Sequence, residues 1–332
     1  MSDDATTPAP ANPGARAFEH RPVMVEEITA LFDDVPAGTV VDATLGGGGH
    51  SAALLASRGD LDILGIDRDG DAIAAATRRL GDHEGRFRSS RRRFDEFDEA
   101  LADHDIDEIS GALFDLGVSS PQLDRGERGF SYRHEGPLDM RMDTEQTWSA
   151  ADVVNGYTEA DLSHLIARYG DERFAKRIAR AICAARPVQG TTELAAIVTA
   201  AIPAAARRTG GHPAKRTFQA IRIEVNAELA ALPEALDQAI TATVPGGRIA
   251  VLAYHSGEDR IVKRHFATAA GACECPDDLP CVCGAVQTVR IVRGVPKRPC
   301  APERESNRRA SAARLRVVER IVTTPKSERN RP

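Results

Sequence analysis

Short apolar segments alternate with amphipathic ones along the first third of the chain. Residues 39–44, 61–67 and 109–116 are apolar runs bounded by glycine or charged residues, which predicts buried strands, and 86–90 are predicted to form a further strand. Between these runs, the segments 51–56 and 71–80 carry apolar positions at helical spacing. This alternation predicts an α/β fold, in which helices cover both faces of a mostly parallel, doubly wound sheet.

The alternation then stops, and strand-like runs return only near the C-terminal end. The intervening chain has Ala, Ile and Leu at helical spacing in residues 159–169, 172–185, 193–206 and 217–231. Residues 248–254 and 314–319 again have the pattern of strands. We therefore predict one α/β domain formed by residues 18–124 and 227–332, interrupted by an inserted helical domain, residues 125–226.

The chain has 332 residues, of which 42% are hydrophobic and 28% charged, a balance typical of a globular protein with a substantial core. Residues 1–17 are acidic and then rich in Pro and Ala, which predicts a disordered tail. This start has neither the basic nor the apolar region of a secretory signal, and no run of about 18 apolar residues follows. We expect a cytoplasmic protein that does not associate with membranes.

The net charge of −6 does not by itself indicate a nucleic-acid-binding protein, but the basic residues are segregated. Two clusters stand out: Arg86, Arg88, Arg91, Arg92 and Arg93, and, near the C-terminus, Lys297, Arg298, Arg304, Arg308, Arg309, Arg314 and Arg316. Each cluster is either a phosphate-binding surface or simply a solvated charged face.

A glycine-rich turn, from Gly46 to His50, joins the first predicted strand to the first helix. Glycines allow close approach of the backbone to a ligand, and the helix N-terminus offers free N–H donors. Asp67 ends the next strand, 19 residues after Gly48, where a carboxylate can accept hydrogen bonds from ribose hydroxyls. Ser51 stands where a dinucleotide site has its third glycine, and no Lys follows as in a P-loop. A methyl-donor site, a dinucleotide site and a structural turn remain open.

Three acidic residues come at the ends of predicted strands: Asp42, Asp67 and Asp115. In an open α/β sheet, ligands bind outside the carboxyl ends of the strands, so we expect these carboxylates to converge on one crevice. The structural alternative for each is a helix N-cap.

Six longer segments are specific rather than generic. They are residues 115–124 (DLGVSSPQLD), 127–131 (ERGFS), 136–143 (GPLDMRMD), 169–180 (YGDERFAKRIAR), 212–222 (HPAKRTFQAIR) and 254–264 (YHSGEDRIVKR). The chain, from about His20 to Glu319, closely resembles the bacterial ribosomal RNA small subunit methyltransferase H family. The resemblance implies a Rossmann-like methyltransferase fold and S-adenosylmethionine-dependent N4-methylation of a cytidine in 16S ribosomal RNA near the decoding centre, within a small-subunit particle.

The resemblance also implies a donor-binding set of residues, carried over by position. It consists of Gly48, Gly49 and His50 in the turn, Asp67 as the ribose-binding acid, Phe94 beside the adenine, and Asp115 and Gln122 as polar contacts. Phe94 by itself is more typical of a core residue, and only the resemblance favours the adenine contact. The chain departs from the family pattern at Gly47 and Gly257, where larger residues are usual.

The catalytic groups are less well defined by the sequence. Amino methyltransferases commonly carry Asp, Asn or Ser followed by Pro-Pro-aromatic after the fourth strand, whereas this chain has Ser-Pro-Gln at 120–122. Ser120 and His255 are therefore candidate catalytic residues, a Ser-Pro turn and a structural histidine being the alternatives. Tyr254 could help to hold the base. No Cys lies near the expected pocket in sequence, which argues against carbon-5 methylation, since that route needs a thiol nucleophile.

Two further features bear on partners. The helical insertion has basic residues at three- or four-residue spacing, namely Arg173, Lys176, Arg177 and Arg180. A second pair, Arg222 and Asn226, shares a helix face. Each set faces either RNA phosphates or solvent. Cys273, Cys275, Cys281 and Cys283 could form a tetrahedral zinc set, although their spacing is unusual, and free thiols or a disulfide are the alternatives.

Two other functions stay open: a DNA amino-methyltransferase, and a donor-binding ribosome assembly factor without catalysis. The sequence does not fix the oligomeric state and allows a dimer.

Overall fold

The computed structural model describes residues 21–83, 85–208, 211–272, 275, 285–307 and 309–325. The tail predicted at residues 1–17 lies outside these ranges.

A seven-stranded sheet forms the centre of the protein, with the order β3-β2-β1-β4-β5-β7-β6. The strands are β1 (Gly38–Asp42), β2 (Leu61–Asp67), β3 (Phe87–Arg91), β4 (Ile109–Asp115), β5 (Thr243–Ala253), β6 (Val286–Ile291) and β7 (Arg314–Pro325). The strands from β3 to β5 pair in parallel, and β7 runs antiparallel to both β5 and β6. The predicted α/β fold with a mostly parallel sheet is confirmed.

The strands form where the sequence has apolar residues that can be buried on both faces. Every residue of β4 except its last is buried, as expected for a central parallel strand. The prediction missed β6, because this strand lies at the sheet edge and buries only Val289 completely. An edge strand needs no continuous apolar run, so its pattern is weak.

Helices cover both faces of the sheet. The helices α1 (Val25–Leu31), α2 (Gly49–Ser57) and α3 (Gly70–Leu80) share one core with the sheet, and α4 (Phe97–Ala102), α11 (Glu228–Ala242) and α12 (Ser256–Ala269) share another. Because helices cover both faces of the sheet, a ligand can reach it only at the ends of the strands.

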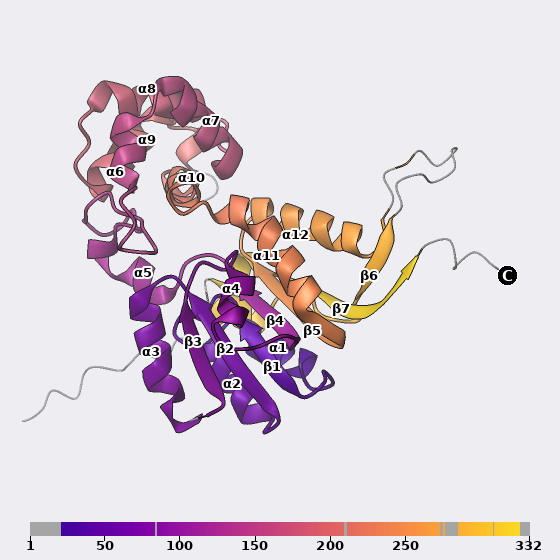
Figure 1. The fold of residues 1–332 in the computed structure, drawn as a ribbon. Coiled ribbons are helices and arrows are strands. Elements are labelled where there is room, and N and C mark those ends of the chain that lie inside the picture. The colour runs from indigo at the N-terminus through magenta and orange to yellow at the C-terminus, as the bar shows by residue number, and fades with distance from the viewer. Residues whose placement is uncertain are drawn as a thin grey trace, which may run out of the picture.

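A second group of helices lies in a separate lobe (Figure 1). It contains α6 (Ala150–Gly156), α7 (Glu159–Gly170), α8 (Ala175–Ala185), α9 (Thr191–Ala201) and α10 (Lys215–Asn226). These helices surround their own hydrophobic core, whose buried members all lie between Phe130 and Val225. We propose on this basis that residues 125–226 are an inserted helical domain. The short helices α5 (Ser120–Asp124) and α13 (Ala301–Ser306) lie outside this group.

The prediction of one continuous helix over residues 217–231 is wrong. Ala227 has φ 50°, in the left-handed region, so α10 ends at Asn226 and α11 begins at Glu228. Helical spacing of apolar residues continues across the break, and for this reason the sequence pattern does not show it.

The lobe contacts the sheet domain where the parallel strands end. Arg68, next to the last residue of β2, donates from Nη1 to the Asn226 carbonyl at 3.0 Å. Ser256, three residues after β5, donates from its hydroxyl to Asp171 Oδ2 of the lobe at 2.6 Å. The lobe therefore borders the end of the sheet at which a ligand is expected. In the described part of the chain, no helix is both long enough and apolar enough to span a membrane.

Candidate active site at the carboxyl ends of the strands

The glycine turn and Asp67 are in direct contact. Gly46 and Gly48 adopt φ values of 49° and 70°, and Gly48 caps α2 in this left-handed conformation. The Gly46 N–H donates to Asp67 Oδ2 at 2.8 Å, and the Asp69 N–H donates to Oδ1 at 2.9 Å. A Cβ added at Gly47 would meet no atom within 4 Å, so the crest of the turn borders open space. This explains how the family can carry a larger residue at position 47.

Burial raises the pKa of Asp67 to about 6, although the two backbone N–H groups that bind the carboxylate act in the opposite direction. A carboxylate that is held by backbone donors in a poorly solvated position is oriented for a further hydrogen-bonding partner.

Asp115 lies at the centre of a second cluster. The Tyr254 hydroxyl, at the end of β5, donates to Asp115 Oδ1 at 2.6 Å. His50, in the first turn of α2, places Nδ1 3.6 Å from Asp115 Oδ2 and Nε2 3.0 Å from the Val23 carbonyl oxygen. His50 is buried, whereas the Asp115 side chain is 27% exposed.

Asp42 is the third member of this cluster and interacts with both Asp115 and His50. Asp42 is 2% exposed, and its carboxylate accepts a hydrogen bond from the Ser51 hydroxyl at 2.6 Å. Burial raises the pKa of Asp42, and the nearby Asp115 raises it further, while Ser51 and His50 lower it. Asp42 and Asp115 interact with each other, and Asp67 holds the neighbouring turn. That the three acids share one ligand-binding crevice stays a prediction.

Gln122 reaches the site through Asp69. Its Nε2 donates to Asp69 Oδ2 at 2.9 Å, and the same oxygen accepts from Arg128 Nη1 at 2.9 Å. Gln122 Oε1 accepts from the Ser119 N–H at 3.0 Å. Asp69 comes two residues after Asp67, and both of its side-chain partners, Gln122 and Arg128, are buried. Gln122 therefore fixes the loop that follows β2.

Phe94 is half-buried, with its ring edge-to-face against Phe114 of β4 at a centroid distance of 6.3 Å. This packing supports the core interpretation of Phe94, and its contact with adenine stays a prediction.

The two candidate catalytic residues occupy helix starts. Ser120 is the first residue of α5, so the Ser-Pro turn considered from the sequence is the opening of a helix. His255 is the N-cap of α12: its Nδ1 accepts from the Gly257 N–H at 3.1 Å, and its Nε2 lies 3.2 Å from Glu258 Oε1. This geometry supports the structural alternative for His255, and its catalytic role stays a prediction.

Sequence reasoning did not single out Arg309. This half-buried side chain comes from the segment between α13 and β7, and it interacts electrostatically with Asp115, Tyr254 and Asp124. Burial lowers the pKa of Arg309, and the acidic neighbours act against this. In the sequence it is one of many C-terminal arginines, and no local signal distinguishes it.

The first basic cluster does not form one surface. Arg86 donates to the carbonyls of Arg58, Leu61 and Leu55, and Arg88 donates to that of His104, so both are structural. The other three line a cavity of about 450 Å³, together with Arg68, Glu96, Asp143, Glu145 and Gln146. Each of these three, Arg91, Arg92 and Arg93, has a carboxylate partner.

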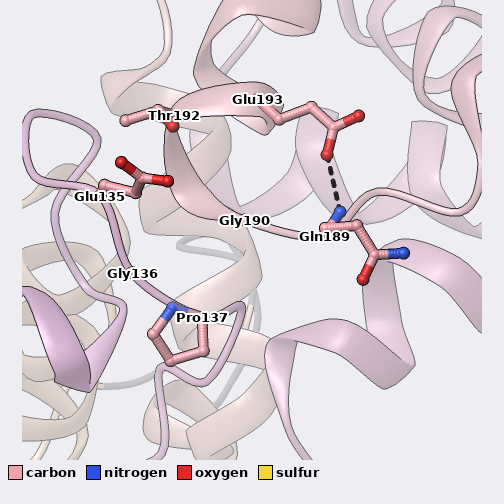
Figure 2. A pocket seen from close by; sticks show the side chains of 7 residues that line it. All are labelled: Glu135, Gly136, Pro137, Gln189, Gly190, Thr192 and Glu193. Carbon is pink, nitrogen blue, oxygen red and sulfur yellow. Dashed lines mark hydrogen bonds between the residues drawn. The ribbon is translucent and has the colours of Figure 1, made fainter.

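A further cavity of about 390 Å³ lies in the helical lobe (Figure 2), lined by Glu135, Gly136, Pro137, Gln189, Gly190, Thr192 and Glu193. It includes none of the predicted site residues. The Glu193 carboxylate beside it accepts from the Gln189 N–H at 2.7 Å.

The predicted basic face of the lobe is partly present. Arg173, Lys176, Arg177 and Arg180 are all exposed. The prediction that Arg222 and Asn226 share a face available to phosphates is wrong. Arg222 forms a two-bond ion pair with Glu228 at 2.8 and 2.9 Å, and the buried Asn226 binds the backbone at Met140 and Met142.

Three of the four clustered cysteines, Cys273, Cys281 and Cys283, lie outside the described residues, and Cys275 is within them. Among the residues that the structure describes, no group of three or more His, Cys, Asp or Glu side chains is arranged to hold a metal ion.

Two features define the class of protein. In the sheet, the antiparallel strand β7 lies between β5 and β6, and the glycine turn contacts the acid at the end of β2. This arrangement is that of a Rossmann-like methyltransferase. The chain belongs to the MraW methylase family, whose model matches residues 17–321.

The relatives agree with this assignment. A protein of *Heliobacterium modesticaldum* named ribosomal RNA small subunit methyltransferase H is 46% identical over 310 residues, which cover 92% of this chain and 99% of that protein. A protein of the same name from Mycobacterium sp. (strain KMS) is 46% identical over 328 residues, which cover 96% of this chain and 88% of that protein. A solved rRNA methylase from *Streptococcus thermophilus* aligns with 90% of this chain and 94% of its own, at 13% identity and a TM-score of 0.38, too weak a likeness to bear on the assignment.

Proposed function

We propose that this protein transfers a methyl group from S-adenosylmethionine to N4 of a cytidine in 16S ribosomal RNA, near the decoding centre. The observation that carries the proposal is the contact between the glycine turn and Asp67, next to the cluster around Asp115. The names of the relatives support a small-subunit ribosomal RNA as substrate.

The residues present fit the methyl donor. No atom would lie within 4 Å of a Cβ at Gly47, so the turn is open on this side, and Asp67 is fixed with spare lone pairs for the ribose hydroxyls. We assign the donor contacts to Gly48, Gly49, His50, Asp67, Phe94, Asp115 and Gln122. When bound, the donor would supply an electrophilic methyl group on a sulfonium, and the buried carboxylate of Asp42 and the partly exposed carboxylate of Asp115 would favour a cation in this position.

The protein's own contribution is orientation. Methyl transfer needs an in-line approach of the amine, and a fixed site supplies most of the advantage by holding both reactants in place. The cytosine amine is a weak nucleophile, so acceptors on its N–H groups stabilise the charge that develops on nitrogen. The partly exposed carboxylate of Asp115 is a candidate for one such acceptor, and Ser120 is a candidate for another.

The substrate base must be unpaired or extruded to reach the site. The lobe borders the carboxyl ends of the strands, and its exposed face around α8 is suited to hold RNA phosphates. We propose that the RNA is presented within a small-subunit particle in the cytoplasm.

The test is mass spectrometry of 16S ribosomal RNA nucleosides from cells that lack this protein. We expect N4-methylcytidine at one position to disappear, and to return with the parent gene but not with Asp67→Ala. Unchanged N4-methylcytidine in the deletion strain would overturn the substrate assignment.

A second assay distinguishes the other functions. Purified protein is given tritiated methyl donor with free RNA, DNA or small subunits. Label in DNA would indicate a DNA amino-methyltransferase, and donor and RNA binding without turnover would indicate an assembly factor.

A further inference from the structure

Two aromatic rings are stacked on the lobe, outside the set of residues assigned to the donor. The rings of Tyr132 and His212 have centroids 4.4 Å apart and an interplanar angle of 18°. Tyr132 also packs edge-to-face on the buried Phe218 of α10, at a centroid distance of 5.8 Å, which fixes it to the core of the lobe. His212 is exposed, so the stack ends in a ring that is accessible to a further partner.

The His212 ring is held in place and is uncharged. Its Nδ1 accepts from the Ala214 N–H at 3.2 Å, just before the start of α10. Partial desolvation, followed by the charge of Arg133, lowers the pKa of His212, so the imidazole is neutral at pH 7. A flat, neutral and fixed ring is a surface on which a nucleobase stacks, as it does on aromatic side chains of proteins that bind single-stranded RNA.

Cations surround the stacked rings. The Arg133 guanidinium lies 5.6 Å from the centroid of the Tyr132 ring. Lys215 and Arg216 are the first residues of α10, in the turn that follows His212. All three cations are exposed, and among the residues that the structure describes neither Arg133 nor Lys215 forms an ion pair with a carboxylate. Because phosphates accompany the bases of a strand, cations beside a stacking surface favour a nucleic acid over an apolar protein segment.

The stacked rings lie close to the end of the sheet where we propose methyl transfer. Arg216 donates from Nη1 to the Asp171 carbonyl at 3.0 Å, and Asp171 Oδ2 accepts from the Ser256 hydroxyl at 2.6 Å. Ser256 comes two residues after Tyr254 of the candidate active site. The helix α10 is also the one that continues from the lobe into α11 (Figure 1). An RNA strand bound at the site can therefore reach the stacked rings.

We propose that Tyr132 and His212 form a stacking platform for an unpaired base that flanks the target cytidine, and that Arg133 and Lys215 bind the adjacent phosphates. The inference rests on the proposed function, because the target base itself must enter the candidate active site. A platform that holds a flanking base out of its own stack lowers the cost of extruding the cytidine.

Two substitutions of His212 separate stacking from a structural role. His212→Asn keeps an acceptor for the Ala214 N–H but removes the ring, whereas His212→Phe keeps a ring but removes the acceptor. The Kd is measured by fluorescence anisotropy with a short, fluorescein-labelled single-stranded RNA. We expect His212→Asn to raise the Kd about 5- to 150-fold, since stacking on an aromatic side chain contributes that factor per base, and His212→Phe to bind within about threefold of the parent.

Donor binding and methyl transfer are followed on the same proteins. The Kd for S-adenosylmethionine should equal that of the parent in both variants, because the platform is separate from the residues assigned to the donor. In methyl transfer to small subunits, His212→Asn should lower kcat/KM by a factor similar to its loss of RNA affinity. The matched control is His265→Asn, which changes a histidine of α12 that lies 2.9 Å from Asp237 and should leave RNA binding as in the parent.

Parent-like RNA binding in His212→Asn would overturn the inference. Binding by His212→Phe that is as weak as that of His212→Asn, or weaker, would also overturn it, because His212 would then act through its hydrogen bond to Ala214. If His212→Asn does not fold, Arg133→Gln at an exposed position decides. The loss of one phosphate contact should reduce the slope of log Kd against log salt by about 0.7, and an unchanged slope overturns the inference.

The failure of the proposed function has a different signature. A parent that binds RNA through the platform but forms no N4-methylcytidine would refute the proposed function and leave the RNA site in place. A parent that binds neither the single-stranded RNA nor small subunits would overturn the platform itself.

Discussion

Asp67 is the side chain whose replacement tests the donor site most directly. Its oxygens accept the Gly46 and Asp69 N–H groups at 2.8 and 2.9 Å, which leaves one lone pair on each for a ribose hydroxyl. Asp67→Asn keeps one acceptor and turns the other into a donor. A hydrogen bond to a charged group contributes about 1.5–3 kcal/mol, so the loss of one should weaken donor binding roughly 10- to 150-fold.

The assay is isothermal titration with S-adenosylmethionine at pH 7.5. Asp71→Asn is the matched control, because the Asp71 carboxylate is 65% exposed and binds Arg125 at 2.8 Å on the surface. The control should bind donor as the parent does. Binding by Asp67→Asn within threefold of the parent would refute the assignment of Asp67 to the ribose.

The pH dependence of binding gives a second measurement on the same variant. The donor binds the ionised carboxylate, whose pKa burial raises to about 6. Below that pH, the carboxyl must lose a proton before binding, so the parent's Kd should be about tenfold higher at pH 5 than at pH 7.5. Asp67→Asn should lack this component. The same pH dependence in both proteins would show that other groups, such as Asp42, cause it.

Three further predictions concern stability, all checked by chemical denaturation followed by circular dichroism. Arg222→Met leaves the buried Glu228 without its cation and should lower the free energy of unfolding by about 3–5 kcal/mol; a neutral effect would contradict the ion pair. Arg91→Gln removes the surface ion pairs with Asp143 and Glu145 and should lower the free energy of unfolding by less than about 1 kcal/mol. A larger decrease would show that these ion pairs hold the lobe in place. Gly111→Ala places a Cβ against the Arg248 carbonyl oxygen in β5 and should lower the free energy of unfolding by about 1–3 kcal/mol or more; an unchanged stability would contradict this close strand contact.

The sequence predicts those parts of the fold whose signal is local. The first strands are apolar runs that end on acids, and the contact between the glycine turn and Asp67 follows from their positions at neighbouring strand ends. β6 has no such signal, because an edge strand is half solvated. Helical spacing gives the apolar face of α10 but not what covers its other side. The spacing predicts that Arg222 faces RNA phosphates or solvent, whereas Glu228, just beyond the break at Ala227, forms an ion pair with it.

The contacts that complete the site are not local in sequence. Tyr254 reaches Asp115 from 139 positions along the chain, and Val23 reaches His50 from 27 positions before it. The N–H of Met24, next to Val23, donates to Glu303 Oε1 at 2.8 Å, so the C-terminal helix α13 holds the segment that orients His50. No spacing rule predicts such contacts, since each depends on where the chain returns after a long excursion.

The structural alternative for the strand-end acids can now be weighed against the binding interpretation. If Asp42, Asp67 and Asp115 were N-caps, each would bind the first free N–H groups of the helix that follows. Instead, α2 is capped by Gly48, and α3 by Asp69, whose side chain accepts from the Asp71 N–H. The acids bind a turn, a serine and a tyrosine, and all three lie at the ends of adjacent strands. Buried carboxylates are costly unless something repays their desolvation, and a bound cationic nucleoside would do so.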